Sequence, residues 1–292
     1  MNTRTSMHHT ITQHIIEAMK HAKDSSTPWL RNQGLPRNAA SQQHYHGINI
    51  LHLWVTANKK QYTSSTWATY KQWNDLGAQV KQGEKSANVI YYQPLSSEAD
   101  EKAVRPRFSA ILKWSSVFNA QQVDGYSEQF PQPNTLLDSV SSADQFVQHT
   151  QAHITHNSDK AYYSPSQDTI VMPDKVLFVG SKTSTPTQAY YAVLLHELTH
   201  WTGHETRCNR LISGKKSSDS YAKEELVAEL GAAFLCAELG IAQEPRQDHA
   251  DYMASWISLL EDNERTIFAA ARLATEAANY LHALQPAMEV AA

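Results

Sequence analysis

The 292-residue sequence has few of the features that mark secreted, disulfide-stabilised or membrane proteins. Its two cysteines, Cys208 and Cys236, can form at most one disulfide, and neither lies in a Cys-x-x-Cys pair. No run of eighteen apolar residues is present, and the first residues lack the apolar core of a secretory signal. We therefore expect a cytoplasmic protein without a membrane partner, whose cysteines are buried or free thiols.

Charge is distributed unevenly, although the net charge is only -4. Residues 1–120 hold 14 Lys/Arg and 7 Asp/Glu, a net of +7, whereas the remainder holds 11 and 22, a net of -11. Because the chain is about twice the common domain size, this contrast predicts two domains with different partners. The basic domain is a candidate for binding nucleic acid or another polyanion. It contains five of the seven tryptophans: Trp29, Trp54, Trp67, Trp73 and Trp114.

The first domain, residues 1–125, is expected to have a small α+β fold. Apolar spacing predicts an amphipathic helix over 11–23 and another over 66–76, and it leaves 48–56 open between a buried strand and a short buried helix. The β-branched and aromatic residues of 87–95 and 107–118 predict two strands joined by a polar loop.

A change in composition predicts the boundary between the domains. The chain becomes rich in Gln, Ser, Pro and Asp beyond Asp124, with Pro131 and Pro133, so we place a linker at 126–143. The second domain then comprises residues 144–292, with short strands expected at 169–172 and 175–179 before three helical blocks.

The segment 185–204 carries the strongest chemical motif, within a well-marked helix. Thr185 is a good N-cap, Pro186 suits the first helical position, and Gln188 completes a capping box. His196 and His200 are four residues apart and so project from one face, with Glu197 beside them. This His-Glu-x-x-His spacing predicts a zinc-dependent metallopeptidase site, in which the two histidines bind the metal and Glu197 is the catalytic general base.

Chance occurrence of this motif is uncommon. With 15 His and 16 Glu, about 0.04 copies are expected in a chain of this length. The alternative is a surface helix whose two histidines bind nothing. Zn²⁺ is the first choice of metal, with Mn²⁺ and Co²⁺ as alternatives.

A zinc hydrolase needs a third protein ligand, and the sequence offers two kinds. His204 follows the motif, but the metzincin pattern places its third histidine at the position of Thr206, which disfavours that class. The expected helix at 221–239 offers Glu225 and Glu229, one turn apart on a face otherwise directed to the core. A solvated acidic start to the helix, which also contains Glu224, is the simpler alternative.

Several motifs together resemble one known family. His-Glu-Leu-Thr-His-Trp-Thr-Gly-His, followed by Tyr-Ala-Lys-Glu-Glu-Leu-Val-Ala-Glu-Leu-Gly-Ala-Ala-Phe, is similar to the C-terminal zincin domain of ArdC-type antirestriction proteins. The upstream segments that resemble the family's N-terminal domain are Pro28-Trp29, Gly47-Ile48-Asn49-Ile50-Leu51, Trp67 to Lys71, Trp73 to Ala78, Lys81 to Lys85, and Val117 to Gln122.

The resemblance implies a plasmid-encoded protein that binds single-stranded DNA during conjugation and protects that DNA from host restriction. It also implies a gluzincin arrangement, in which a glutamate from the second helix completes the metal site. Its place of action is then the cytoplasm of the bacterial host or conjugation recipient, and its peptide substrate an unknown host protein. The N-terminal module is also similar to one in plasmid primases of the TraC type, although this chain has no primase active-site motif.

Aromatic and basic residues interleave in the expected DNA-binding domain. Such residues stack bases and neutralise phosphates without regard to base identity, so we expect sequence-tolerant binding. The alternative is that the tryptophans are core residues and the lysines only solvated. The candidate DNA-binding residues are Trp67, Tyr70, Lys71, Trp73, Lys81 and Lys85.

Two functional hypotheses remain open at this stage. The first is an antirestriction protein that both binds single-stranded DNA and carries a peptidase site; the second is a non-enzymatic coating protein with a structural metal. In gluzincin-like sites an acid four residues after the ligand glutamate orients a metal-bound histidine. We therefore assign Glu225 to the metal and Glu229 to that supporting role, with the reverse assignment still open.

Overall fold

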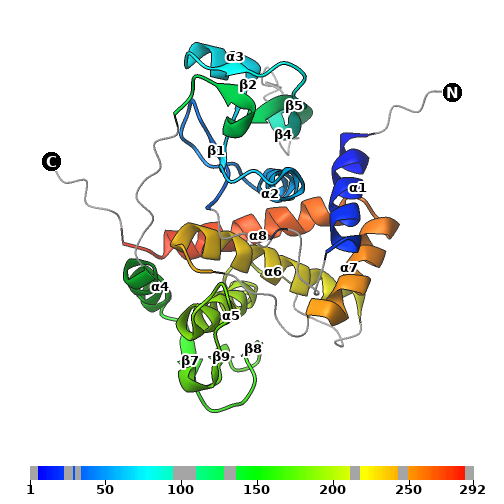
Figure 1. Cartoon of the computed structure of the whole chain (residues 1–292). Helices are drawn as coiled ribbons and strands as arrows, with labels where there is room; N and C mark the ends of the chain where they lie inside the picture. Colours follow the sequence, from blue (N-terminus) through cyan, green and yellow to red (C-terminus); the bar gives the residue numbers. More distant parts are fainter. Residues whose placement is uncertain are drawn as a thin grey trace, which may run out of the picture.

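The computed structural model describes residues 6–22, 29, 34–94, 110–127, 136–210, 218–242 and 249–286. These residues form an α+β structure, as the sequence predicts. Figure 1 shows a sheet of N-terminal residues at one end, a central group of helices, and a second small sheet at the other end. None of the described helices is both long enough and apolar enough to span a membrane.

The N-terminal region builds a sheet around one central helix. The four-stranded sheet has the order β1-β2-β5-β4, in which β1 and β2 are parallel and the other pairs antiparallel, and β3 pairs with β6. The elements are α1 (Met7–Lys20), β1 (Arg37–Asn38), α2 (Ile48–Lys60), β2 (Thr66–Thr69), α3 (Tyr70–Asp75), β3 (Gln79–Val80), β4 (Ala87–Pro94), β5 (Ala110–Asn119), the 3-10 turn η1 (Ala120–Gln122) and β6 (Val123–Asp124).

Tertiary contacts determine the secondary structure of two N-terminal segments, 48–56 and 66–76. The segment at 48–56 belongs to helix α2, which is buried on several sides, so its apolar residues show no single stripe. The helix predicted at 66–76 is only half correct. Thr66–Thr69 is instead strand β2, paired with the end of β5, and α3 begins at Tyr70 behind a capping box formed by Thr69 and Gln72.

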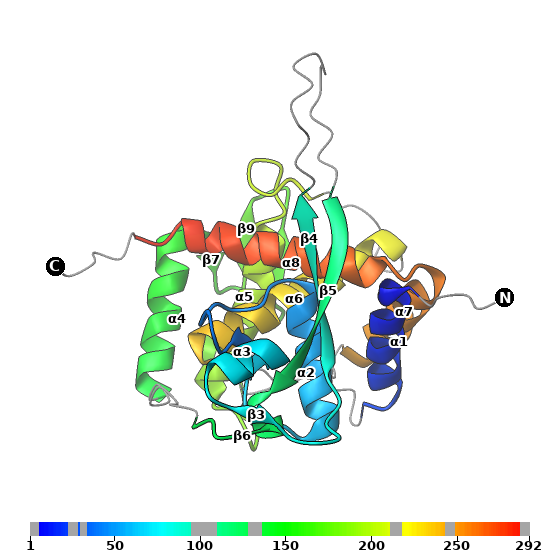
Figure 2. The same ribbon diagram turned by 90° about the horizontal axis from the view of Figure 1, so that it is seen from above.

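Strands β4 and β5 form a long antiparallel ribbon, confirming the two predicted strands. Their register runs from Ala87 opposite Val117 to Pro94 opposite Ala110. Strand β2 pairs only with residues 117–119 of β5. The ribbon therefore continues beyond the rest of the sheet, as Figure 2 shows from above. The loop predicted between these strands lies outside the described residues.

The C-terminal region places helices on a small three-stranded sheet. The sheet has the order β7-β9-β8. The expected strand at 169–172 is confirmed as β9, whereas 175–179 is not a strand and contains a 3-10 turn instead. The elements are α4 (Leu136–Thr150), β7 (His153–Thr155), β8 (Tyr162–Ser164), β9 (Thr169–Val171), η2 (Lys175–Leu177), α5 (Pro186–Trp201), α6 (Asp219–Leu239), α7 (His249–Asp262) and α8 (Thr266–Ala283).

Helix α4 begins inside the segment predicted as a linker. The second half of 126–143 is helical from Leu136, because Ala143 and Phe146 are buried in the same core as α5. A composition of Gln, Ser and Asp hid this helix, since its stability comes from packing rather than from intrinsic propensity.

One hydrophobic core is shared between the N-terminal and C-terminal regions. Apolar residues of α1 and α2 pack with those of α6, α7 and α8 in a single cluster. At its centre the rings of Trp54 on α2 and Phe234 on α6 lie 5.8 Å apart. The helix that carries Glu225 therefore packs directly against the N-terminal region, and a division of the chain at 126–143 remains a proposal.

Candidate metal centre

Helix α5 begins as its sequence predicts, which fixes the phase of the His-Glu-x-x-His motif. The Thr185 side chain accepts from the backbone N–H of Gln188, the reciprocal bond is formed, and Pro186 occupies the first turn. The helix ends at Trp201. His196 and His200 are only 3% and 8% exposed, and their ring centroids lie 4.8 Å apart.

Helix α6 crosses α5 at very short range. A Cβ placed on Gly231 would lie 2.5 Å from Cγ2 of Thr199, closer than real Cβ atoms come. Glycine is thus required here by close approach of the two helices. The contact brings the acidic residues of the first turns of α6 to the histidines of α5.

Glu225 lies between the two histidines. One carboxylate oxygen is 3.5 Å from Nε2 of His196, and the other is 3.5 Å from Nε2 of His200. One ligand atom from each of these three residues lies within 4.8 Å of the others, and all three residues are buried. Two imidazole nitrogens and a carboxylate oxygen are a donor set that suits Zn²⁺ and related divalent ions. The three residues could therefore hold one metal ion.

The opposite ring nitrogens of both histidines face other carboxylates. Nδ1 of His200 is 3.2 Å from Oε1 of Glu224, and Nδ1 of His196 is 3.8 Å from Oε2 of Glu229. An acid at this position fixes the tautomer and the orientation of a metal-binding histidine. The structure thus places Glu225 on the Nε2 side of the histidines and Glu229 on the Nδ1 side.

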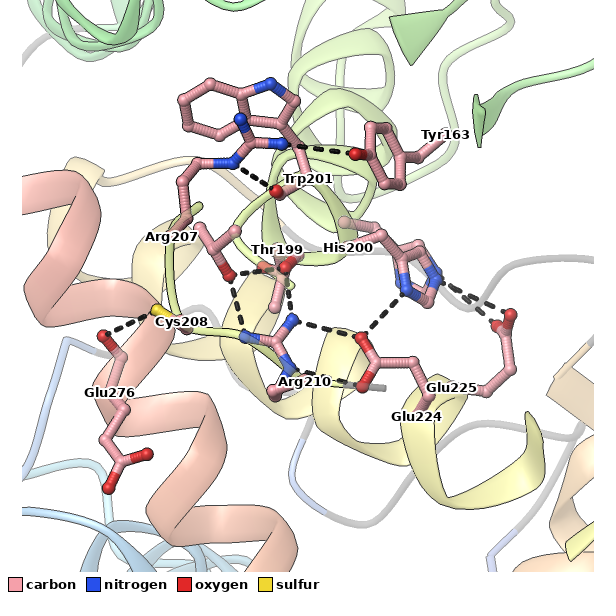
Figure 3. Close-up of polar contacts among 12 residues, drawn as sticks. Tyr163, Thr199, His200, Trp201, Arg207, Cys208, Arg210, Glu224, Glu225 and Glu276 are labelled. Atoms are coloured by element: carbon pink, nitrogen blue, oxygen red, sulfur yellow. Dashed lines mark hydrogen bonds and ion pairs between the residues drawn. The ribbon is translucent and has the colours of Figure 1, made fainter. Parts of the chain in front are cut away.

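Arg210 holds Glu224 in place and was not identified from the sequence. Its guanidinium donates to both oxygens of Glu224, at 3.2 and 3.0 Å, and also to the Thr199 carbonyl and the Thr202 hydroxyl. Figure 3 shows this bridge between the end of α5 and the beginning of α6. The sequence around a single arginine outside any motif does not indicate which residues it binds. Glu224 was recognisable only as one of three glutamates near the beginning of α6, with Glu225 and Glu229.

The electrostatics of the cluster favour a cation among these residues. Burial alone lowers the pKa of His200, but hydrogen bonds to Glu224 and Glu225 outweigh burial and raise that pKa to about 10. Burial raises the pKa of Glu225, yet hydrogen bonds to His196 and His200 dominate and bring it below the usual range. Buried carboxylates need a compensating positive charge, which a divalent ion supplies as well as a proton.

Glu197 and His204, the other candidates from the motif segment, lie in different surroundings. Glu197 is 3% exposed and lies next to His196 on α5. His204 lies beyond the end of the helix, where its Nδ1 contacts the Thr206 hydroxyl at 2.9 Å. It does not belong to the metal-ligand cluster found among the described residues, in agreement with the sequence argument against a metzincin.

Two of the predicted DNA-binding residues are core residues. Trp67 and Trp73 are 1% and 0% exposed, and the Trp73 indole N–H donates to the Phe118 carbonyl at 3.0 Å. A ring without an exposed face cannot stack on a base, so this part of the prediction is wrong. The aromatic spacing reflects core packing instead: Trp67 packs with residues of α2, and Trp73 packs with residues of β3 and β6.

The other four predicted DNA-binding residues are exposed but do not form a compact group of unpaired cations. The Tyr70 hydroxyl accepts from Gln79, and the Lys71 ammonium pairs with Asp75 at 2.6 Å. Lys81 lies 3.8 Å from Asp124. Lys85 is exposed next to the start of β4.

A Gly231→Ala substitution is expected to separate the two helices of the metal centre. The new methyl group would overlap the β-branched side chain of Thr199, and overpacking of this kind costs about 1–3 kcal/mol of unfolding free energy. Metal affinity should fall as well, because Glu225 moves relative to the histidines. Denaturant unfolding and metal titration measure the two effects.

Gly34→Ala is the matched control for this experiment. Its nearest contact would be the Ala237 carbonyl at 3.8 Å, an ordinary van der Waals distance. Unchanged stability and metal affinity in the Gly231 variant would show that the helices do not depend on close approach.

The fold and the site define a class of protein. Two histidines one turn apart on a buried helix, a glutamate between them in sequence, and a glutamate from the following helix are the features of a zincin-like metallopeptidase domain. Residues 141–273 match the family model of the zincin-like metallopeptidase, and residues 5–125 match that of the N-terminal domain of anti-restriction factor ArdC.

Solved structures identify the family. The metal-free crystal structure of the antirestriction ArdC protein from plasmid R388 is 36% identical, covers 96% of this chain and 97% of its own, and has a TM-score of 0.78. The Mn(II)-bound structure of that protein gives a TM-score of 0.76. The chain belongs to the ArdC family of antirestriction proteins.

Sequence relatives include both short and long proteins. The protein y4eC of Sinorhizobium fredii, described as uncharacterized, is 37% identical over 97% of this chain and 94% of its own length. Two DNA primases TraC of Escherichia coli are 34% and 32% identical over 98% and 95% of this chain. The chain spans only 20% and 27% of those two primases.

Proposed function

We propose that this antirestriction protein binds single-stranded DNA through its N-terminal region and cleaves a host protein with a metal-dependent peptidase site. It would act in the cytoplasm of the bacterial cell that holds or receives the plasmid. The observation that supports the peptidase site most strongly is the position of Glu225 between the Nε2 atoms of His196 and His200, with Glu197 buried beside them.

We assign His196, His200 and Glu225 as the metal ligands. Glu225 approaches Nε2 of both histidines, whereas Glu229 approaches only Nδ1 of His196. This difference supports Glu225 as the ligand and Glu229 as the orienting acid. Within the described residues the cluster has three members, which leaves a coordination position for water, as in catalytic rather than structural sites. A purely structural metal is therefore the weaker alternative.

The chemistry of peptide hydrolysis follows from these roles. A bound divalent ion, for which Zn²⁺ is our first choice and Mn²⁺ the next, activates water and polarises the scissile carbonyl. Glu197 accepts the proton of the attacking water and passes it to the leaving amine. The carboxylates of Glu224 and Glu229 hold the two histidines in one orientation throughout.

The DNA-binding half of the proposal is supported by charge and by the family. The first 120 residues carry a net charge of +7, and the same region matches the N-terminal domain of ArdC. Phosphate neutralisation by lysines makes binding weaken steeply as salt rises. We expect full-length protein to bind oligonucleotides of different sequence with similar affinity and a strong salt dependence; a flat salt response would contradict this mode of binding.

Glu197→Gln protein is the reagent that tests the peptidase. It should retain its metal and its DNA binding but lose hydrolysis, because Glu197 is a base and not a ligand. In a pull-down with single-stranded DNA it should hold an uncleaved host protein that wild-type protein cleaves. Glu205→Gln, at an exposed acid of the same region, is the control and should behave as wild type. Loss of metal from the Glu197 variant would contradict the proposed role.

A further inference from the structure

Trp114 on strand β5 is exposed, in contrast to the other tryptophans. Its side chain is 56% exposed, and the nearby Tyr91 on β4 is 47% exposed. The other six are between 0% and 7% exposed: Trp29, Trp54, Trp67, Trp73, Trp201 and Trp256. Tryptophan and tyrosine are enriched where a protein buries surface against a partner.

The exposed aromatic residues lie on the projecting part of the β4–β5 ribbon. Tyr91 is paired with Lys113 across the two strands, and Ile90 is paired with Trp114. Because neighbouring residues of a strand point to opposite faces, Tyr91 and Lys113 share one face and Trp114 lies on the other. Strand β2 does not reach beyond Val117, so this part of β5 has a free backbone edge among the described residues. Ile90 opposite Trp114 and Val89 beside Tyr91 are buried, so the accessible part of the ribbon consists of the Tyr91, Lys113 and Trp114 side chains and one strand edge.

The charge of the ribbon favours an anionic partner. Neither strand β4 nor strand β5 contains an aspartate or glutamate. Within the part of the chain that the structure describes, Lys113 makes no ion pair, whereas Lys71 pairs with Asp75 and Lys81 lies near Asp124. The Lys113 side chain is exposed, so its ammonium can contact a phosphate.

We propose that the β4–β5 ribbon is a binding surface for single-stranded nucleic acid, in which a base stacks on Trp114, a second base stacks on Tyr91, and Lys113 contacts the phosphates. This inference rests on the proposed DNA-binding function and assigns its location. Exposed rings accept unstacked bases of any identity, whereas a duplex offers its phosphates but keeps the faces of its bases stacked. The ribbon therefore suits single strands, and it replaces the buried Trp67 and Trp73 as the source of stacking.

Full-length Trp114→Ala and Tyr91→Ala proteins test the assignment with a labelled oligothymidylate at low salt. Loss of one stacked base should weaken binding about 10-fold or more for Trp114→Ala, and Trp114→Phe should recover much of that loss. Tyr162→Ala is the matched control, since Tyr162 is 47% exposed but lies on β8 of the C-terminal region, and its affinity should stay within about 2-fold of wild type. Thermal unfolding and metal affinity should be unchanged in all four variants.

Tryptophan fluorescence gives an independent measurement. Because Trp114 alone among the seven is exposed, oligothymidylate should quench wild-type emission and protect it from iodide, and should do neither in Trp114→Ala. If wild-type protein binds the oligonucleotide while both ribbon variants bind equally well, the ribbon is not the site and the proposed function stands. A loss in Tyr162→Ala as large as that in the ribbon variants would also contradict a site on the ribbon. Failure of wild-type protein to bind would overturn the proposed function itself.

Discussion

Replacing Glu225 with alanine is expected to remove nearly all metal binding from this protein. The substitution deletes the carboxylate whose two oxygens face both Nε2 atoms, and leaves only two of the three proposed ligands. Glu229→Ala should have a smaller effect, because loss of an acid that orients a bound histidine typically weakens metal binding about 10 to 100-fold. Titration of metal-free protein with Zn²⁺ and with Mn²⁺ measures both affinities.

The comparison between these two variants decides the assignment. A greater loss in Glu229→Ala than in Glu225→Ala would reverse the roles of the two acids. His204→Ala is the control that should leave affinity unchanged. If His204→Ala strips the metal and neither glutamate matters, the gluzincin arrangement is incorrect. Circular dichroism of each metal-free variant shows whether a loss of affinity reflects a loss of fold.

The second large effect is expected at Arg210. Arg210→Met keeps much of the side-chain volume but leaves the Glu224 carboxylate buried without its guanidinium partner. Breaking a buried ion pair in this way costs about 3–5 kcal/mol of unfolding free energy. Metal affinity should fall about 10 to 100-fold, because Glu224 no longer holds the His200 ring in position. Urea unfolding and metal titration provide the two measurements.

A second substitution separates the structural effect from the effect on the metal. Adding Glu224→Gln to the Arg210 variant removes the buried charge, so stability should recover while metal affinity remains low. Arg207→Met is the control on the same loop: Arg207 lies over the Trp201 ring and pairs with Asp168, away from the ligands. It should lose some stability but retain wild-type affinity. Wild-type stability in Arg210→Met would show that the bridge is not needed to balance Glu224.

Local chemistry determined which parts of the structure the sequence could predict. Helix α5 is predictable because Thr185, Pro186 and Gln188 act within one turn, and the phase of that helix then places both histidines. Strand β2 was wrongly predicted as helix, because its strand conformation depends on pairing with a distant segment: Trp67 pairs with Asn119, 52 positions away. No local pattern reports such a contact.

Prediction of the candidate site was likewise limited by contacts between residues that are distant in sequence. The gluzincin-like spacing favoured Glu225 over Glu229 as the ligand but left the reverse assignment open. The structure adds which ring nitrogen each acid approaches. Arg210 was missed because its partners, Thr199 and Glu224, belong to two different helices. Burial was the other missing quantity: sequence spacing cannot distinguish a tryptophan that stacks on a base from one that fills a core.

The core shared by α2 and α6 also affects which parts of this protein can be exchanged by recombination. Cutting the chain after residue 125 would leave the apolar side of α2, including Trp54, without the C-terminal helices that cover it. Exchange of either half alone should therefore destabilise the protein, and we expect recombination to transfer both halves together. The primase relatives fit this expectation, since they match 98% and 95% of the chain, and not merely its N-terminal part, within much longer proteins.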